Sequence, residues 1–218
     1  MVWAERAVKI CGIRTVDHAM VAAQAGADYI GVILAPSKRQ IMPEQAKSIQ
    51  HVIRQVNQTT KLVGVFVNEQ PSMINQLVRD IGLDIVQLSG DETSTIISAI
   101  DAPMFKTIRM SKHDAEQAWI MLAQDQPDRV RLHIDAHVAG SYGGAGVVAD
   151  WEQAQALARE LPILLAGGLH PTNVRDAIQT VQPWGVDVSS GIETAGTKDS
   201  TKIQTFITNA REAFSKED

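Results

Sequence analysis

Hydrophobic residues recur along the chain as short, continuous β-branched runs, separated by longer stretches whose apolar positions follow a helical period. Such runs are typical of strands buried on both faces of a parallel sheet. They predict strands over residues 8–11, 29–34, 62–67, 85–88, 104–108, 130–135, 163–166 and 186–188. The stretches after them predict helices over 16–25, 43–55, 71–81, 93–100, 112–123, 151–161, 172–181 and 202–214.

The alternation of strand and helix predicts an α/β fold built from right-handed βαβ units. Eight units favour closure into a (β/α)8 TIM barrel, and 218 residues lies at the compact end of the range for that fold. An open, doubly wound sheet is the alternative, but no GxGxxG follows the first strand. No linker or low-complexity segment divides the chain, so we expect a single domain over residues 1–218. The longest irregular stretch, 136–150, is typical of a functional or disordered loop.

Composition narrows the possible partners. Hydrophobic residues make up 44% of the chain, and 20 Lys and Arg against 25 Asp and Glu give a net charge of −5. This balance argues against a nucleic-acid or anionic-membrane surface. No segment approaches the roughly 18 apolar residues of a membrane helix, and the first residues lack the apolar core of a signal peptide. We therefore expect a cytoplasmic protein, in which Asn57-Gln58-Thr59 matches a glycosylation acceptor by chance.

The only cysteine, Cys11, ends the first predicted strand. A lone cysteine forms neither an internal disulfide nor a cysteine-cluster metal site. In barrels of this kind the active site is built from the carboxyl ends of the strands and the loops that follow them. Cys11 is therefore either a small, inert core residue or, as a thiolate near cationic groups, a base.

Polar residues at other strand ends are candidates for the same site. Asp135 closes an apolar strand, where a carboxylate is costly unless it is used or paired. Gln87 stands within the fourth strand and serves either a structural hydrogen bond or a ligand. Arg39 follows the second strand and is either a solvated loop charge or a fork for a carboxylate. We assign no role to His137.

Small residues follow the last two strands. Gly167 and Gly168 come after the seventh strand, and Ser189, Ser190 and Gly191 after the eighth. Amide-rich turns at this pair of positions commonly bind phosphate in such barrels, because backbone N–H groups hold the dianion. The sequence therefore predicts a phosphorylated substrate.

Two further features adjoin these turns. The carboxylate of Asp187 repels phosphate, so we expect it to serve sugar hydroxyls or backbone hydrogen bonds. The loop after the sixth strand holds Gly143, Gly144 and Gly146, which allow close approach of backbone to a ligand; a mobile lid is the other interpretation.

Eight sequence motifs occur in order along the chain. They are KICGI at 9–13, GADYIG at 26–31, SKR at 37–39, GVFVN at 64–68, VQLSGDE at 86–92, YGGAG at 142–146 followed by DW at 150–151, AGGLHPTNV at 166–174 and VDVSSGIE at 186–193. Together they resemble the phosphoribosylanthranilate isomerase family of tryptophan biosynthesis. The resemblance runs from about residue 8 to the end of the chain.

The resemblance implies a (β/α)8 barrel and an Amadori rearrangement that uses no cofactor or metal. N-(5-phosphoribosyl)anthranilate would become 1-(2-carboxyphenylamino)-1-deoxyribulose 5-phosphate. It further implies that Cys11 is the base, as a thiolate, and that Asp135 is the general acid, protonated part of the time. Arg39 would bind the anthranilate carboxylate, with Gln87 and the glycine loop at Gly143 and Gly144 as further substrate contacts. The expected partner is this small molecule, and the expected assembly is a monomer or a homodimer.

The chain departs from the family pattern at three places. Ser89 stands where the family commonly has His, and Val147-Val148 where it often has Lys-Thr. The spacing from Pro36 to Arg39 is one residue shorter than in some relatives. These departures concern the side chain at 89, a cation in the loop and the register of Arg39, whereas Cys11 and Asp135 match the family pattern.

Other barrels that bind phosphate are alternatives. Metal-dependent pentose-phosphate epimerases need several His and Asp ligands, and the six His of this chain do not fall together at strand ends. Histidine-pathway isomerases use aspartates at the ends of strands one and five, where this chain has Cys11 and Arg109. A non-catalytic phosphate-binding barrel is the alternative outside enzymes, and the presence of both Cys11 and Asp135 argues against it.

Overall fold

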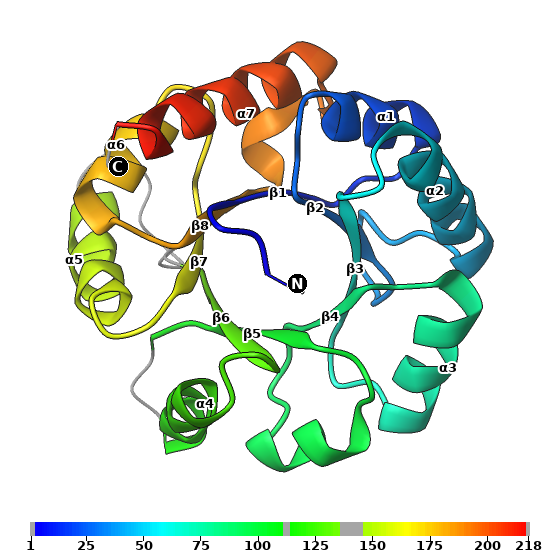
Figure 1. Cartoon of the computed structure of the whole chain (residues 1–218), viewed down its shortest axis with the longest axis horizontal. Helices are drawn as coiled ribbons and strands as arrows, with labels where there is room; N and C mark the ends of the chain where they lie inside the picture. The colour runs from blue at the N-terminus through cyan, green and yellow to red at the C-terminus, as the bar shows by residue number, and fades with distance from the viewer. Residues whose placement is uncertain (1–2, 111–113, 136–145, 217–218) are drawn as a thin grey trace.

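A computed structural model describes residues 3–110, 114–135 and 146–216. Eight parallel strands close into a barrel in the order of the chain, and helices surround it (Figure 1). The strands are β1 (Ala7–Cys11), β2 (Tyr29–Ile33), β3 (Lys61–Phe66), β4 (Ile85–Leu88), β5 (Met104–Ile108), β6 (Val130–Asp135), β7 (Ile163–Ala166) and β8 (Gly185–Val188). The predicted fold class and the eight predicted strands are confirmed.

Helices follow the strands along the outside of the barrel. They are α1 (Val16–Gln24), α2 (Pro43–Val56), α3 (Pro71–Ile81), α4 (Asp114–Asp125), α5 (Gly146–Ala158), α6 (Val174–Val181) and α7 (Ser200–Phe214). The start of the helix predicted over 112–123 lies outside the described residues, as does most of the irregular stretch predicted over 136–150. Within that stretch, α5 begins at Gly146, earlier than predicted.

The helix predicted over 93–100 is wrong in type. The chain forms the 3-10 helix η1 (Ser94–Ala99) there. Hydroxyl side chains compete for hydrogen bonds in this segment: Thr93 Oγ1 lies 2.8 Å from Thr95 Oγ1, and Ser98 Oγ donates to the Thr95 carbonyl at 3.2 Å. Such local bonds offer the backbone an alternative to a regular α-helix.

The strands and helices share an outer hydrophobic core. On α6, for example, Val174, Ala177, Ile178 and Val181 form one fully buried stripe at helical spacing. Prolines begin α2 and α3, where a missing N–H costs nothing, and Gly82 ends α3 in the left-handed region at φ 78°. These local signals explain why the predicted boundaries of α2 and α3 lie close to the observed ones.

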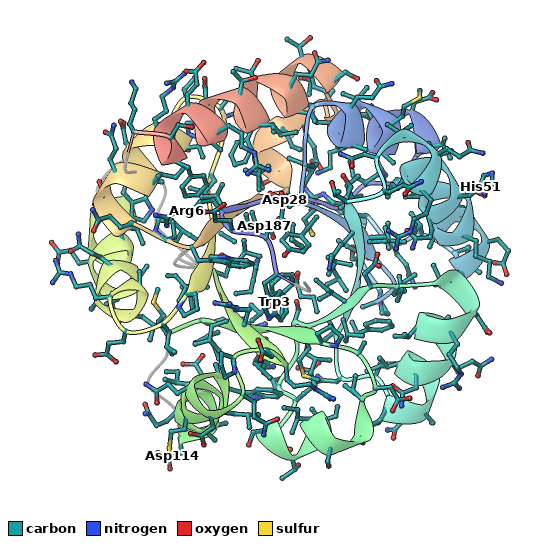
Figure 2. The ribbon with its side chains drawn as sticks, viewed as in Figure 1. Trp3, Arg6, Asp28, His51, Asp114 and Asp187 are labelled. Carbon is teal, nitrogen blue, oxygen red and sulfur yellow. The ribbon has the colours of Figure 1, made fainter. Side chains whose placement is uncertain are left out.

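A separate aromatic cluster fills the amino-terminal end of the barrel. The rings of Trp3 and Phe105 lie 5.3 Å apart, and Tyr29 meets Phe105 edge-on at 5.5 Å. The guanidinium of Arg131 lies 5.0 Å from the ring of Trp184 and 5.6 Å from that of Trp3. Figure 2 shows Trp3 within the ring of strands. The cluster fills this end, and the residues that line the cavity lie toward the carboxyl ends of the strands.

Above the aromatic cluster the interior becomes polar. Side chains alternate in direction along a strand, so β1 places both Lys9 and Cys11 inside. Cys11 pairs with Gly31 of β2. A Cβ on Gly31 would lie 2.9 Å from Cys11 Sγ and 3.3 Å from Lys9 Nζ, so this glycine provides the space in which both groups lie.

Between β8 and α7 the chain adds η2 (Ser190–Ile192) and a short hairpin. The hairpin pairs β9 (Glu193–Thr194) with β10 (Thr197–Lys198) in antiparallel fashion. It brings Glu193 and Lys198 to the mouth of the barrel beside β1.

Candidate active site

A cavity of about 400 Å³ lies at the carboxyl ends of the strands. Its walls include most of the residues that the sequence singled out: Cys11, Gln87, Asp135, Gly167, Gly168, Asp187, Ser189 and Ser190. Ser89, Thr107, Arg109 and His133 also line it. These side chains come from strands far apart in the chain, and closure of the barrel brings them together.

Cys11 is buried, with 7% of the residue exposed. Burial raises the pKa of its thiol above the ordinary value, and the nearby charges of Lys9 and Lys198 only partly offset this effect. Removal from water favours the neutral thiol, whereas the two cations favour the anion, so the predicted thiolate depends on these lysines. The groups that oppose the effect of burial are the two lysines.

Lys9 and Asp187 form a buried ion pair beside the thiol. Lys9 Nζ donates to Asp187 Oδ2 at 2.8 Å, and His133 Nε2 lies 2.9 Å from the same oxygen. Burial by itself raises the pKa of Asp187, but the charge of Lys9 and the hydrogen bond from His133 bring it below its ordinary value. Burial likewise lowers the pKa of Lys9, but Asp187 and Cys11 raise it overall. Both members of the pair are charged.

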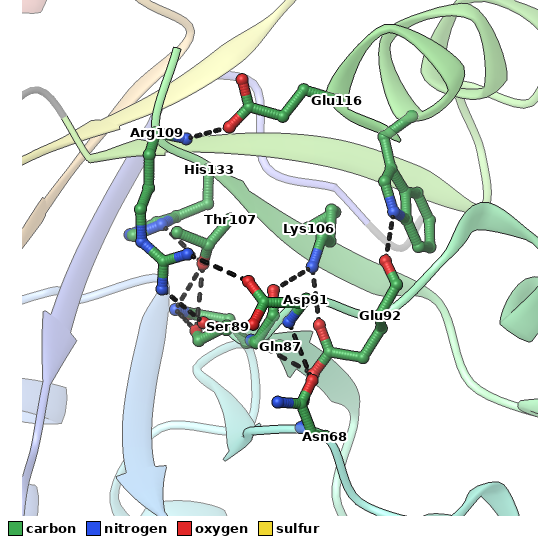
Figure 3. Close-up of polar contacts among 12 residues, drawn as sticks. Asn68, Gln87, Ser89, Asp91, Glu92, Lys106, Thr107, Arg109, Glu116 and His133 are labelled. Atoms are coloured by element: carbon green, nitrogen blue, oxygen red, sulfur yellow. Dashed lines mark hydrogen bonds and ion pairs between the residues drawn. The ribbon is translucent and has the colours of Figure 1, made fainter. Parts of the chain in front are cut away.

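A line of hydroxyl and amide groups continues from His133 along the cavity wall (Figure 3). Thr107 Oγ1 lies 3.1 Å from His133 Nδ1, and Ser89 Oγ lies 3.0 Å from Thr107 Oγ1. Gln87 Nε2 donates to Ser89 Oγ at 3.1 Å. The line joins strands β4, β5 and β6 to Asp187 on β8.

Two buried acceptor atoms on this wall have no hydrogen-bond partner within the described part of the chain. They are Gln87 Oε1 and Asp187 Oδ1. Both residues line the cavity and are about 95% buried, with 4% and 5% exposed. Because a buried polar atom without a partner is costly, the two oxygens fit a ligand that brings hydroxyl donors.

Arg39 is held by a carboxylate from its own chain. Its Nε and Nη2 donate to Glu193 Oε1 and Oε2 at 2.6 and 2.9 Å. Lys198 Nζ donates to Glu193 Oε1 at 3.0 Å and to the Ser189 carbonyl at 2.8 Å. The hydrogen bond from Arg39 is the largest influence on Glu193 and, with Lys198, lowers its pKa to about 2.

The position of Arg39 bears on its predicted role. The fork with Glu193 uses the Nε–Nη2 edge of the guanidinium, and a second edge, formed by Nη1 and Nη2, can take another carboxylate. Arg39 packs over the end of β1, since a Cβ on Gly12 would lie 2.8 Å from its Cδ. It is next to Cys11 rather than in the wall of the cavity itself.

The turns after β7 and β8 differ in why they need glycine. Gly167 and Gly168 have φ angles of 91° and 67°, in the region that disfavours other residues. A Cβ on Gly191 would instead overlap the carbonyl oxygen of Leu169, so Gly191 allows the two turns to pack together. Gly191 is not in the cavity wall, unlike Ser189 and Ser190.

Gly143 and Gly144 lie outside the described residues. Lys9, His133 and Glu193 were not predicted as site residues. The alternation along strands could have found the first two, because Lys9 and His133 precede Cys11 and Asp135 by two positions and therefore point the same way. Glu193 ends the last family motif, but nothing in the sequence indicated that the hairpin would bring it to Arg39.

Comparison with known proteins identifies the family of this chain. Residues 8–209 match the family described as N-(5'phosphoribosyl)anthranilate (PRA) isomerase. The chain belongs to the phosphoribosylanthranilate isomerase family. The sequence resemblance is therefore confirmed over most of its length.

Relatives in this family are similar along their whole length. N-(5'-phosphoribosyl)anthranilate isomerase of Roseiflexus sp. (strain RS-1) is 51% identical over 213 residues, covering 94% of this chain and 98% of the relative. The crystal structure of phosphoribosyl anthranilate isomerase from Thermotoga maritima superposes with a TM-score of 0.81 at 34% identity, covering 95% and 99% of the two chains. Another crystal structure of phosphoribosyl anthranilate isomerase, in complex with reduced 1-(o-carboxyphenylamino)-1-deoxyribulose 5-phosphate, has a TM-score of 0.79 at 32% identity and covers 95% and 99% of the chains.

Two negative findings concern the described residues alone. No group of three or more His, Cys, Asp and Glu side chains among them is placed to hold a metal ion. None of the helices in this part of the chain has the length and apolar character needed to cross a membrane.

Proposed function

We propose that this chain isomerises N-(5-phosphoribosyl)anthranilate to 1-(2-carboxyphenylamino)-1-deoxyribulose 5-phosphate. The observation that carries the proposal is the joint placement of Cys11, Asp135 and the turns after β7 and β8 in one cavity. The family of the chain and the relative solved with a reduced form of the product support the same activity.

The phosphate anchors one end of the substrate. Gly167, Gly168, Ser189 and Ser190 form the part of the wall that offers small residues and backbone amides. Binding the non-reacting dianion fixes the sugar relative to Cys11 and Asp135, which turns proton transfer into an intramolecular event. Gly191 supports this cradle from behind by letting the two turns pack.

Asp135 acts first, as the general acid. Its proton goes to the furanose ring oxygen, the C1–O bond breaks, and the nitrogen lone pair forms a Schiff base at C1. Asp135 ends β6, is half-buried and lines the cavity. A positioned acid of this kind contributes about 10²–10⁴-fold to the rate.

Cys11 then acts as the base. Its sulfur takes the proton from C2, and the electrons of that bond form the C1–C2 double bond of an enolamine, which tautomerises to the ketone. Only the thiolate can accept this proton, and burial works against it. The positive charges of Lys9 and Lys198 stabilise the thiolate. Turnover therefore depends on both the sulfur and its cationic neighbours.

The remaining groups orient the substrate. Gln87 Oε1 and Asp187 Oδ1 accept from the sugar hydroxyls, which would satisfy two buried atoms that otherwise lack partners in the described structure. The second edge of Arg39 takes the anthranilate carboxylate, while Glu193 holds the first. Gly143 and Gly144 stay predicted substrate contacts.

The test is direct turnover by the purified protein. Phosphoribosylanthranilate is fluorescent, and we expect its fluorescence to decay when the protein is added. A stable signal together with phosphate-dependent binding would favour the non-catalytic phosphate-binding barrel. Turnover of another sugar phosphate alone would favour a different isomerase of the same fold.

Location and assembly follow from the proposed activity and the relatives. We propose action in the cytoplasm, as the composition led us to expect. A related phosphoribosylanthranilate isomerase from Thermotoga maritima is described as dimeric, which makes a homodimer one of the two expected assemblies. Light scattering in solution would distinguish it from a monomer.

A further inference from the structure

His133 lies inside the barrel and joins two walls of the cavity. It is 5% exposed and belongs to β6, two residues before Asp135. One ring nitrogen, Nε2, lies 2.9 Å from Asp187 Oδ2 on β8, and the other, Nδ1, lies 3.1 Å from Thr107 Oγ1 on β5. Neither the acid step nor the base step uses this imidazole directly.

The hydrogen-bond network fixes where the imidazole proton lies. Asp187 is ionised beside Lys9, and an ionised carboxylate only accepts. Nε2 therefore carries the hydrogen that it donates to Asp187. In the neutral imidazole Nδ1 is then an acceptor, and the hydroxyl of Thr107 donates to it. Ser89 and Gln87 continue the same direction of donation along the wall.

The two carboxylate oxygens of Asp187 have different hydrogen-bond partners. Oδ2 receives both Lys9 and His133, whereas Oδ1 has no partner within the described residues and belongs to a side chain in the cavity wall. Without His133, rotation about the Cβ–Cγ bond would let both oxygens approach Lys9. With His133 in place, one oxygen stays turned away from the ion pair.

We propose that His133 is a positioning residue, which holds the carboxylate of Asp187 so that Oδ1 meets a hydroxyl of the sugar phosphate. The inference rests on the proposed function, since it concerns the same substrate. It adds a specificity element: a pentose phosphate with a free hydroxyl at this point is bound better than its deoxy analogue. His133 touches no reacting atom and acts through Asp187.

Kinetics of single and double variants test this proposal. His133→Leu fills similar space without a donor, and we expect kcat/KM to fall roughly tenfold, mostly through KM, as for one hydrogen bond to a charged group. His133→Gln can place an amide N–H near the position of Nε2 and should restore part of the loss. His51→Leu, on the exposed face of α2 (Figure 2), is the matched control and should leave both constants unchanged.

The double variant separates action through Asp187 from a general structural effect. Asp187→Asn already removes the charged acceptor. In this background, the additional His133→Leu substitution should lower kcat/KM by less than about threefold. Equal losses in both backgrounds, or a KM within twofold of wild type for His133→Leu alone, would overturn the proposal. If His133→Leu does not show the circular-dichroism spectrum of a folded protein, His133→Gln replaces it in the double-variant test with Asp187→Asn. The proposal then requires that the losses of kcat/KM in these two variants are non-additive.

A readout without turnover keeps this inference distinguishable from the proposed activity. Two-bond ¹H–¹⁵N spectra report which imidazole nitrogen carries the proton. We expect one buried histidine with its hydrogen on Nε2, whose signal shifts in Asp187→Asn and stays in His51→Leu. A hydrogen on Nδ1 instead would contradict the proposed hydrogen bond from His133 to Asp187, even if isomerisation is observed. The expected tautomer without any turnover would agree with this hydrogen bond and refute the proposed activity.

Discussion

Gly31 of β2 pairs with Cys11 of β1, and a Cβ on Gly31 would lie 2.9 Å from the Cys11 sulfur and 3.2 Å from its Cα. A methyl group at this position must displace the sulfur or the strand. Since a shift of about 1 Å in a reacting group can cost 10²-fold in rate, Gly31→Ala should lower kcat by tenfold or more while the far-UV spectrum is retained. Steady-state kinetics and circular dichroism measure the two effects.

Gly64→Ala is the comparison for that variant. A Cβ on Gly64 would lie 2.5 Å from Leu83 Cδ1 in the outer core, on the side of the sheet away from Cys11. Overpacking of this kind costs about 1–3 kcal/mol of stability. We expect Gly64→Ala to lower Tm with kcat nearly unchanged; equal losses of kcat in both variants would show that packing, not the position of the sulfur, limits turnover.

Removal of the Lys9 charge should raise the pKa of the Cys11 thiol further. Burial already raises this pKa, and the charge of Lys9 opposes it. Because Cys11 is the only cysteine, the rate of its alkylation by iodoacetamide against pH reports this one group. In Lys9→Met the midpoint should move to higher pH, and kcat/KM at pH 7 should fall with the thiolate fraction.

Lys106→Met provides the matched control. Lys106 is also buried in the barrel and pairs with Glu92 at 2.6 Å, so its loss breaks a similar buried ion pair away from Cys11. Figure 3 shows this pair beside Asn68 and Asp91. Both variants should be less stable, but only Lys9→Met should move the thiol midpoint. A midpoint that stays at the wild-type value would exclude Lys9 as the opposing charge.

Loss of either proposed proton-transfer group, Cys11 or Asp135, should abolish isomerisation but not binding. Cys11→Ser replaces the thiol by a much weaker acid that cannot act as a thiolate base, and Asp135→Asn removes the acidic proton. Each should lower kcat by at least about 10²–10⁴-fold. Calorimetric titration with the product should still show binding in both variants. Near wild-type turnover in either one would refute the assigned roles.

Glu193 should make stability depend on acid pH. Its pKa is lowered from 4.5 to about 2 by Arg39 and Lys198, so its ionised form is favoured by folding. The sign follows from linkage: this contribution is complete above pH 4.5 and is lost as pH falls toward 2. Denaturant unfolding at pH 6, 4 and 3 should show a steeper loss of stability for wild type than for Glu193→Gln.

The same variant tests the placement of Arg39. If Glu193 holds the guanidinium for the anthranilate carboxylate, Glu193→Gln should raise KM with a smaller effect on kcat, because one charged hydrogen-bond partner of Arg39 is weakened. A lower KM would instead show that Glu193 competes with the substrate for Arg39.

A new negative charge at the phosphate turn should weaken substrate binding. Ser190 is exposed at the cavity wall, so Ser190→Asp places a carboxylate beside the proposed phosphate without filling the core. We expect KM to rise tenfold or more and the effect to shrink at high salt. Ser98→Asp, on the exposed face of η1, is the control and should change neither constant. An unchanged KM in Ser190→Asp would place the phosphate elsewhere.

The pattern of amino acids alone predicted the fold and much of the site wall. Buried β-branched runs alternating with amphipathic stretches allow few arrangements, and closing eight of them brings every carboxyl end to one mouth. The sequence therefore predicted that Cys11, Asp135 and the turns after β7 and β8 lie together, as they do in the cavity wall. Lys9 and His133 precede Cys11 and Asp135 by two positions, so the alternation along a strand also predicts that they face the interior. The sequence analysis did not include them in the site.

Which polar groups meet, and in what ionisation state, depends on the closed barrel. Lys9 and Asp187 are 178 residues apart, and Arg39 and Glu193 are 154 apart, so no local pattern encodes either pair. The pKa of Cys11 depends on the balance between its burial and the charges of Lys9, Asp187 and Lys198. The effect of burial varies steeply with solvent access, and the effect of the charges varies with their distance from the sulfur. Both solvent access and distance are set only when the barrel closes.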